Sequence, residues 1–282
     1  MKTFLPITRD QVLKMFQPIN PKTHKGIQGH ALLIGGSYGK IGSLILSSKA
    51  ALKTGCGLVT SYIPKCGYTI LQTAVPEIMV LTDNEEKIIS KIEYAIHPQA
   101  IGIGPGMGTD SQTQKALHEF LKTNQIPLVV DADAINCIAI QNSLFKLLQP
   151  KTILTPHVKE LERLIGTWNS VEEMLQKTMN LSLQYNLIIV LKGAPTLIVD
   201  GKIIYENTTG NAALATAGSG DVLTGMITSL LAQSYNAIDA AILGVYLHGL
   251  CADLKDSNTS TQSFIASDII ENLGNSFLNL GI

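Results

Sequence analysis

The residues of this sequence best suited to chemistry lie in one short run, 215–225, which reads ATAGSGDVLTG. Gly218 and Gly220 let the backbone approach an anion closely, and the N–H groups and dipole of the helix that follows would face that anion. The run therefore predicts a phosphate cradle. Asp221 falls in the first turn of the helix, where its carboxylate could accept a proton from a hydroxyl group that attacks phosphorus. The alternative is that the helix dipole alone favours an acidic residue there.

Two commoner phosphate-binding motifs are excluded. Lys40 follows Gly39, but Ile41 stands where a Walker A motif requires Ser or Thr, and Ile34 stands at the position of its leading glycine. The run 102–107, GIGPGM, has Met107 at the third glycine of a dinucleotide-binding fingerprint. Any phosphate chemistry is therefore assigned to the cradle.

Other polar residues stand where predicted strands end or helices begin. Asp131 and Asp133 follow a strand and could bind magnesium or substrate, because Mg²⁺ takes oxygen ligands and bridges phosphates; alternatively, Asp133 only caps the short helix that follows. His157, with Glu160 three residues on, favours a helix cap, and no further ligands at helical spacing support zinc. The remaining histidines have no recognisable partners and receive no role: His24, His30, His97, His118 and His248.

Short apolar strands alternate with helices along the chain, which predicts a doubly wound, mostly parallel α/β sheet flanked by helices. Thr8 and Gln11 have the spacing of a capping box at an opening helix that ends before Pro18. Asp200-Gly201 has the sequence of a hairpin turn between two short strands. We expect strands at about 30–34, 57–63, 100–103, 127–130, 152–154 and 188–191, helices at 42–52, 113–121, 158–165 and 171–185, and three helices from Gly220 onward.

The composition fits one large unit, and we expect residues 1–282 to form a single domain. Only 15% of residues are charged while 45% are hydrophobic, which suits a sheet buried on both faces. A net charge of −1 without a basic run argues against nucleic acid and membrane partners. The four cysteines lie far apart, and no secretory leader is recognisable, so we expect reduced thiols and a cytoplasmic location.

Taken with four other motifs, the cradle resembles a known family. These are VVDADAIN at 129–136, LTPHVKEL at 154–161, LKGAPT at 191–196 and TTGN at 208–211. In this order, and spread over nearly the whole chain, they resemble the ADP/ATP-dependent NAD(P)H-hydrate dehydratases. The resemblance implies a ribokinase-like fold and magnesium-dependent repair of hydrated NADH and NADPH (NADHX and NADPHX). The hydroxyl of the S epimer is phosphorylated, and phosphate then leaves.

The resemblance also implies which residues touch each ligand. Asp221 would be the general base on the substrate, and Ser43, Gly106 and His157 would contact the hydrated nicotinamide. Family members commonly carry Ala at the position of Ser43, and Pro and Gly where Val158 and Lys159 stand. The nucleotide would be held by Lys192, Gly193, Ala194, Pro195, Thr196, Asn211, Gly218 and Gly220.

Two other functions use the same features. A ribokinase-like kinase acting on a vitamin precursor would need the same cradle and base, and a non-catalytic nucleotide sensor would need the cradle alone. The sensor is disfavoured, because binding gains nothing from an extra carboxylate beside phosphate. The resemblance further implies ADP as phosphoryl donor, a homo-oligomer that is a tetramer, and a separate epimerase that acts in the same pathway.

Overall fold

A computed structural model describes residues 3–19, 21–255 and 259–281. It contains one ten-stranded sheet with the order β1-β10-β9-β8-β7-β6-β5-β2-β3-β4. Neighbours are parallel except at β8–β9 and β9–β10, which are antiparallel. The strands are β1 (Thr3–Pro6), β2 (His30–Ile34), β3 (Leu58–Ile63), β4 (Met79–Thr82), β5 (Ala100–Ile103), β6 (Leu128–Val130), β7 (Ile153–Leu154), β8 (Ile188–Leu191), β9 (Leu197–Asp200) and β10 (Ile203–Glu206). The doubly wound, mostly parallel architecture predicted from sequence is confirmed.

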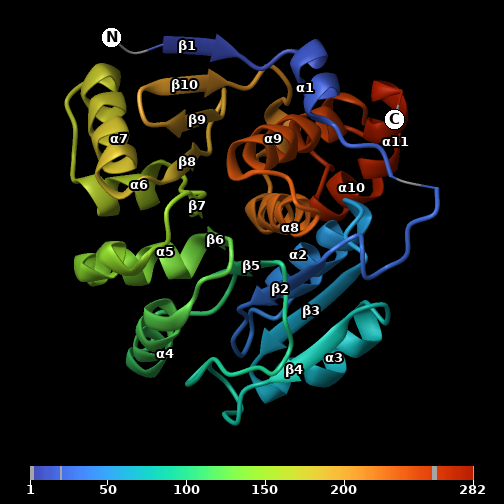
Figure 1. Ribbon diagram of the computed structural model, residues 1–282, viewed down its shortest axis with the longest axis vertical. Helices are drawn as coiled ribbons and strands as arrows, with labels where there is room; N and C mark the ends of the chain where they lie inside the picture. Colours follow the sequence, from blue (N-terminus) through green and yellow to red (C-terminus); the bar gives the residue numbers. More distant parts are fainter. Residues whose placement is uncertain (1–2, 20, 256–258, 282) are drawn as a thin grey trace.

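Helices cover both faces of the sheet (Figure 1). The long helices are α2 (Gly42–Lys53), α4 (Ser111–Thr123), α5 (Ala132–Ile140), α7 (Val171–Tyr185), α8 (Ser219–Ala232) and α9 (Ala237–Asp253). The shorter ones are α1 (Arg9–Met15), α3 (Tyr68–Ala74), α6 (Val158–Ile165), α10 (Ala266–Glu271), α11 (Leu273–Leu280) and the 3₁₀ turns η1 (Lys65–Gly67), η2 (Asn142–Leu147) and η3 (Ala212–Leu214). Within the described ranges, none of these helices combines the length and apolar character needed to cross a membrane.

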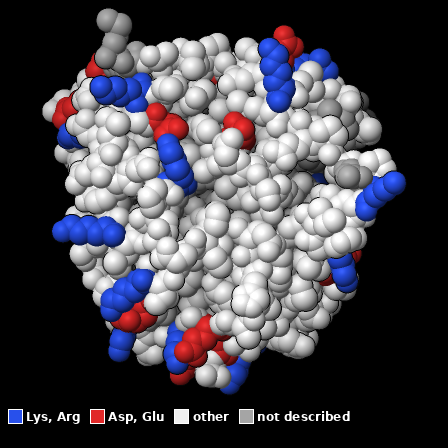
Figure 2. Space-filling model, in the orientation of Figure 1, with Lys and Arg blue, Asp and Glu red and all other residues white. Residues whose placement is uncertain are grey.

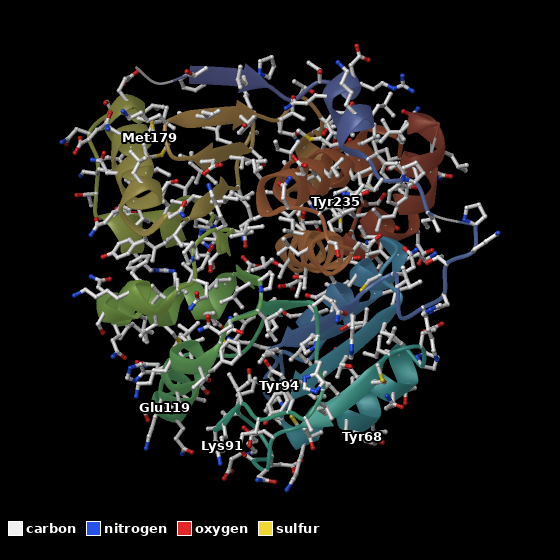
Figure 3. The ribbon with its side chains drawn as sticks, viewed as in Figure 1. Tyr68, Lys91, Tyr94, Glu119, Met179 and Tyr235 are labelled. Carbon is white, nitrogen blue, oxygen red and sulfur yellow. The ribbon has the colours of Figure 1, made fainter. Side chains whose placement is uncertain are left out.

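Two apolar cores lie on opposite faces of the sheet. One joins the sheet to α2, α8, α9, α10 and α11, and the other joins it to α4, α5 and α7. Figure 3 labels a residue of each: Tyr235 lies among the first group of helices and Met179 lies on α7. Strands β2 and β5 are buried almost throughout, because helices cover both of their faces.

The chain leaves β2 in one direction to β3 and β4, and then continues from β5 on the other side of β2. Loops that follow β2 and β5 therefore diverge at a topological switch point, where doubly wound sheets bind ligands beyond the carboxyl ends of their strands. The glycine-rich loops 35–39 and 104–108 both lie here, and Gly36 N–H donates to the carbonyl oxygen of Pro105 across 2.8 Å.

Several sequence expectations need correction. Four helices, not three, follow the cradle, because the chain bends at Asn272 between α10 and α11. Strands β1 and β4 and helix α3 were not anticipated. All four residues of β1 are exposed, so it lacks the apolar pattern of a buried strand. Helices α6 and α7, the hairpin at Gly201 and the Thr8 cap of α1 are confirmed.

Helix α8 lies against α2 at a distance that only glycine permits. A Cβ atom built on Gly225 would lie 2.1 Å from the carbonyl oxygen of Ser47. We predict that Gly225→Ala lowers the free energy of unfolding by about 1–3 kcal/mol, because an overpacked contact must shift a helix backbone. Urea denaturation followed by circular dichroism measures the change.

The matched control is Gly274→Ala in α11, where a Cβ would meet no atom within 4 Å. Alanine should leave stability unchanged there or raise it by up to about 1 kcal/mol through its higher helix propensity. Equal stability of the two variants would contradict the close-packing argument.

Candidate functional site

A pocket of about 990 Å³ opens beyond the carboxyl ends of β6, β7 and β8. The cradle, the β8–β9 loop and the segment after β10 form its walls, and α9 closes it with Val245, His248 and Gly249. Figure 2 shows that charged side chains are sparse at the centre of the face in view and gather toward its margins. The residues expected to hold a nucleotide all line this pocket: Lys192, Gly193, Ala194, Pro195, Thr196, Asn211, Gly218 and Gly220.

The cradle begins at Gly218, the N-cap of α8, which has the left-handed angle φ 85°. This conformation favours glycine, and a Cβ atom at this position would also lie 2.4 Å from Leu46 Cδ1, so that side chain would have to shift. The N–H groups of Gly220 and Asp221 lie in the first turn of α8, where a helix supplies no acceptor of its own. They are therefore available to an anion, and the binding of a phosphate there stays a prediction.

Asp221 lies at the boundary of the pocket, in the first turn of α8. Burial raises the pKa of Asp221 to about 6, and the carboxylate of Asp131 acts in the same direction. A hydrogen bond from Ser43 and the charge of Lys192 act the other way. A carboxylate with this pKa is ionised at neutral pH and is a stronger base than an ordinary aspartate, which suits a general base.

Asp131, at the carboxyl end of β6, is 1% exposed, and both of its carboxylate oxygens accept hydrogen bonds. Its Oδ1 accepts hydrogen bonds from Lys192 Nζ at 2.7 Å and Thr155 Oγ1 at 2.8 Å, and its Oδ2 accepts one from Thr224 Oγ1 at 2.8 Å. Burial would lower the pKa of Lys192, but the charges of Asp131 and Glu160 outweigh this effect and raise it. Lys192 therefore keeps its positive charge inside the pocket.

His157 is the N-cap of α6 and also lines the pocket. Its Nδ1 accepts hydrogen bonds from the N–H groups of Lys159 and Glu160, at 3.1 and 3.3 Å, and Glu160 Oε2 accepts from the His157 N–H at 2.8 Å. The capping interpretation is confirmed. The other ring nitrogen, Nε2, lies 3.4 Å from Glu160 Oε1, so it faces the carboxylate of the same capping box.

Ser43 and Gly106 lie on the other side of Asp221 and are not part of the pocket wall. The Ser43 hydroxyl is near enough to lower the pKa of Asp221, and a Cβ on Gly106 would lie 3.1 Å from Ser43 Oγ. The residues expected to touch the substrate thus converge on Asp221 from α2, from the β5–α4 loop and, through His157, from α6. Their contacts with ligand stay predictions.

Asp133 does not cap a helix, and that alternative is wrong. It lies inside α5, whose N-cap residue is Asp131. Its Oδ2 accepts from the Gly108 N–H at 2.9 Å and lies 3.4 Å from Lys40 Nζ, while its Oδ1 accepts from Asn136 Nδ2 at 3.3 Å. Asp133 faces a second, smaller pocket.

A magnesium site within the chain itself is not preformed. Among the described residues, no group of three or more His, Cys, Asp or Glu side chains could hold a metal ion. Both oxygens of Asp131 accept hydrogen bonds from protein donors, and Glu160 Oε2 accepts one from the His157 N–H and lies 3.8 Å from Lys192 Nζ. This donor set suits an ion bound mainly by phosphates.

His248 was assigned no role from sequence, yet it lines the pocket beneath the cradle. Its Nε2 lies 3.0 Å from the carbonyl oxygen and 3.1 Å from the hydroxyl of Ser219. Since a carbonyl only accepts, Nε2 carries the proton, and burial lowers the pKa of His248 to about 4, which keeps the ring neutral. The histidine contacts Ser219 across 29 residues of sequence, so no local pattern indicates it.

Comparison with known proteins agrees with this geometry. The family model described as NAD(P)H-hydrate dehydratase matches residues 31–275. The ADP-dependent (S)-NAD(P)H-hydrate dehydratase of Lactiplantibacillus plantarum is 32% identical over 252 residues, 88% of each chain. The bifunctional NAD(P)H-hydrate repair enzyme Nnr of Moorella thermoacetica is 37% identical over 260 residues, which cover 88% of this chain and 49% of that protein. The chain thus spans about half the length of the bifunctional relatives it matches.

Solved structures show the same relationship. The ADP/ATP-dependent NAD(P)H-hydrate dehydratase of Bacillus subtilis, co-crystallized with ATP/Mg²⁺, superposes with a TM-score of 0.82 at 28% identity and covers 99% of both chains. Ribokinase of Arabidopsis thaliana, at 12% identity and a TM-score of 0.53, shares the fold. The expected ribokinase-like fold is confirmed.

The raised pKa of Asp221 predicts that its ionised carboxylate lowers the free energy of unfolding at neutral pH. A carboxyl whose pKa is raised on folding stabilises the native state at low pH, and that contribution is lost as pH rises through about 6. We therefore expect Asp221→Asn to be more stable than the unaltered protein at pH 7.5, on the order of 1–2 kcal/mol, with the difference shrinking toward pH 4. Thermal denaturation from pH 4 to pH 8 measures it, and a difference independent of pH would contradict the raised pKa.

Proposed function

Because this chain belongs to the NAD(P)H-hydrate dehydratase family, we propose that it dehydrates the S epimer of hydrated NADH and NADPH, with ADP as phosphoryl donor and AMP and phosphate as products. The observation that carries the proposal is the position of Asp221. Its partly buried carboxylate stands in the first turn of α8, between a pocket that offers phosphate-binding N–H groups and the Ser43–Gly106 side.

The first step transfers the terminal phosphoryl group of ADP. Asp221 accepts the proton of the substrate hydroxyl, whose oxygen attacks the β-phosphorus while the bond from that phosphorus to AMP breaks. The N–H groups of the cradle and the ammonium of Lys192 would stabilise the charge that develops on the phosphoryl oxygens. The product of this step is a phosphate ester of the hydrated ring.

The second step expels phosphate. Hydroxide is a poor leaving group at neutral pH, whereas phosphate departs readily, with the lone pair of the ring nitrogen assisting the break of the carbon–oxygen bond. Loss of a proton from the neighbouring ring carbon then restores the dihydronicotinamide. His157 lines the pocket at the cap of α6 and would contact the ring there.

The nucleotide would bind with magnesium. Asp131 and Glu160 are buried carboxylates of the pocket, and both already accept hydrogen bonds from the protein, so the ion would be held mainly by the phosphates. A magnesium ion held there would neutralise phosphate charge in the transition state. The donor names of the relatives, ADP-dependent in one and ADP/ATP-dependent in another, support ADP as donor.

We extend the proposal to the setting of the enzyme. Phe4, Leu5 and Ile203 are 45%, 39% and 37% exposed at the outer edge of the sheet, which favours a homo-oligomer; light scattering would test for a tetramer. All four cysteines are free thiols, as a cytoplasmic location requires. A separate epimerase would supply the S epimer, so this chain alone should leave the R epimer unconverted.

Asp221→Asn tests the proposed base. We expect the unaltered protein with Mg²⁺, ADP and hydrated NADH to restore the absorbance of reduced nicotinamide, and the variant to lower kcat by about 10²–10⁴-fold, since general-base catalysis contributes that much. Circular dichroism of the variant checks that the fold is kept.

Two outcomes would count against the proposal. A stable phosphorylated product, detected by ³¹P NMR, would favour the vitamin-precursor kinase. Tight ADP binding without turnover of the hydrate would favour the non-catalytic nucleotide sensor.

A further inference from the structure

A second pocket lies beside the proposed active site, on the α5 and α6 side of the sheet. Its volume is about 450 Å³, and it is lined by Thr109, Asp133, Asn136, Ala139, Ile140 and Arg163. Ile140 is 62% exposed, so the wall offers an apolar surface next to a charged one.

Two chain segments connect this pocket with the side of Asp221 on which the substrate is expected. In the β5–α4 loop, Gly106 lies next to Ser43, Gly108 N–H donates to Asp133, and Thr109 lines the second pocket. Helix α6 makes the same connection, because its cap, His157, lines the main pocket while Arg163, six residues on, lines the second. A ligand extending away from Asp221 could follow either element into the second pocket.

Arginine is rare in this chain, with Arg9 and Arg163 the two arginines among 21 basic residues. Arg9 donates to the carbonyl oxygens of Asn279 and Leu280 at the end of α11. Arg163 donates from Nη1 to Asn136 Oδ1 at 2.7 Å, and no carboxylate of the described ranges forms an ion pair with it. A guanidinium matches two phosphate oxygens at once, which lysine does not.

A chain of hydrogen bonds fixes this guanidinium. Asn136 donates to Asp133 Oδ1 at 3.3 Å, and Asp133 in turn accepts from Gly108 N–H and pairs with Lys40. The one negative group of the pocket is therefore already compensated by protein donors. A second cation, Lys40 Nζ, lies 3.4 Å from Asp133 Oδ2. The Arg163 guanidinium therefore lies in the second pocket without a carboxylate partner among the described residues.

We propose that this second pocket binds a phosphate group of the dinucleotide substrate, with the Arg163 guanidinium as its ligand, while the hydrated nicotinamide lies at Asp221. The inference rests on the proposed function and names what holds the rest of the substrate. Ala139 and Ile140 would contact a sugar or base beside that phosphate.

The experiment compares Arg163→Gln with the unaltered enzyme on three substrates: hydrated NADPH, hydrated NADH and the hydrate of reduced nicotinamide mononucleotide. We expect KM for hydrated NADPH to rise about 10- to 100-fold, as for a lost charge-assisted bond, with kcat and the KM for ADP nearly unchanged. An equal rise for hydrated NADH would assign Arg163 to the pyrophosphate, and a rise for hydrated NADPH alone would assign it to the 2′-phosphate. Either result supports the proposal, and the mononucleotide, which keeps only the nicotinamide-side phosphate, should respond only if Arg163 binds that phosphate.

Lys146→Gln is the matched control. It removes one exposed positive charge from η2, on the same side of the sheet but outside both pockets, and should change no KM. Unchanged KM values for all substrates in Arg163→Gln, or equal effects in the two variants, would overturn the proposal.

A binding measurement separates this inference from the proposed function. NADPH fluorescence reports the Kd of NADPH itself, without turnover, and Arg163→Gln should weaken it about tenfold or more while Lys146→Gln does not. If the unaltered protein converts no hydrate but this difference holds, the proposed function fails and the pocket stands. Equal Kd values in all three proteins would refute the pocket.

Discussion

The site depends on one buried carboxylate. Asp131 ends β6 and accepts hydrogen bonds from Thr155 after β7, Lys192 after β8 and Thr224 on α8. A buried charge is tolerated only when it is paired and hydrogen-bonded, so the Asp131 carboxylate depends on these donors keeping their positions. One side chain therefore joins three strand ends to the helix that carries the cradle. The same charge helps to raise the pKa of Asp221.

The two halves of the proposed chemistry meet at Asp221. Nucleotide-binding candidates come from the β8–β9 loop, the segment after β10 and the cradle, all of which lie in the second half of the chain. Substrate-binding candidates come from α2, the β5–α4 loop and α6. The switch point between β2 and β5 brings the early loops to the same edge of the sheet as the late ones. This is the position at which one carboxylate can touch a substrate on one side and a phosphoryl group on the other.

Sequence patterns predicted the parts of the fold whose signals are local. Strands β2, β5 and β8 and helices α6 and α7 were placed to the residue, because their apolar periods are bounded by Gly, Pro or capping residues. Exposed β1 carries no such period. The cradle and Asp221 were found because they are contiguous, whereas the Asp131–Lys192 pair spans 61 residues and the Ser219–His248 contact spans 29. Partnerships across such distances are set by topology, and a single sequence does not display them.

The charges on the walls of the main pocket influence which ligands can enter it. They contain three carboxylates, Asp131, Glu160 and Asp221, and a single ammonium, Lys192. A bare nucleotide, itself polyanionic, therefore meets a lining that repels it beyond the short reach of the helix N–H groups. A nucleotide that arrives with a divalent cation brings its own compensation. In the proposed reaction, this excess of acidic groups would favour the metal complex of the nucleotide over the free anion.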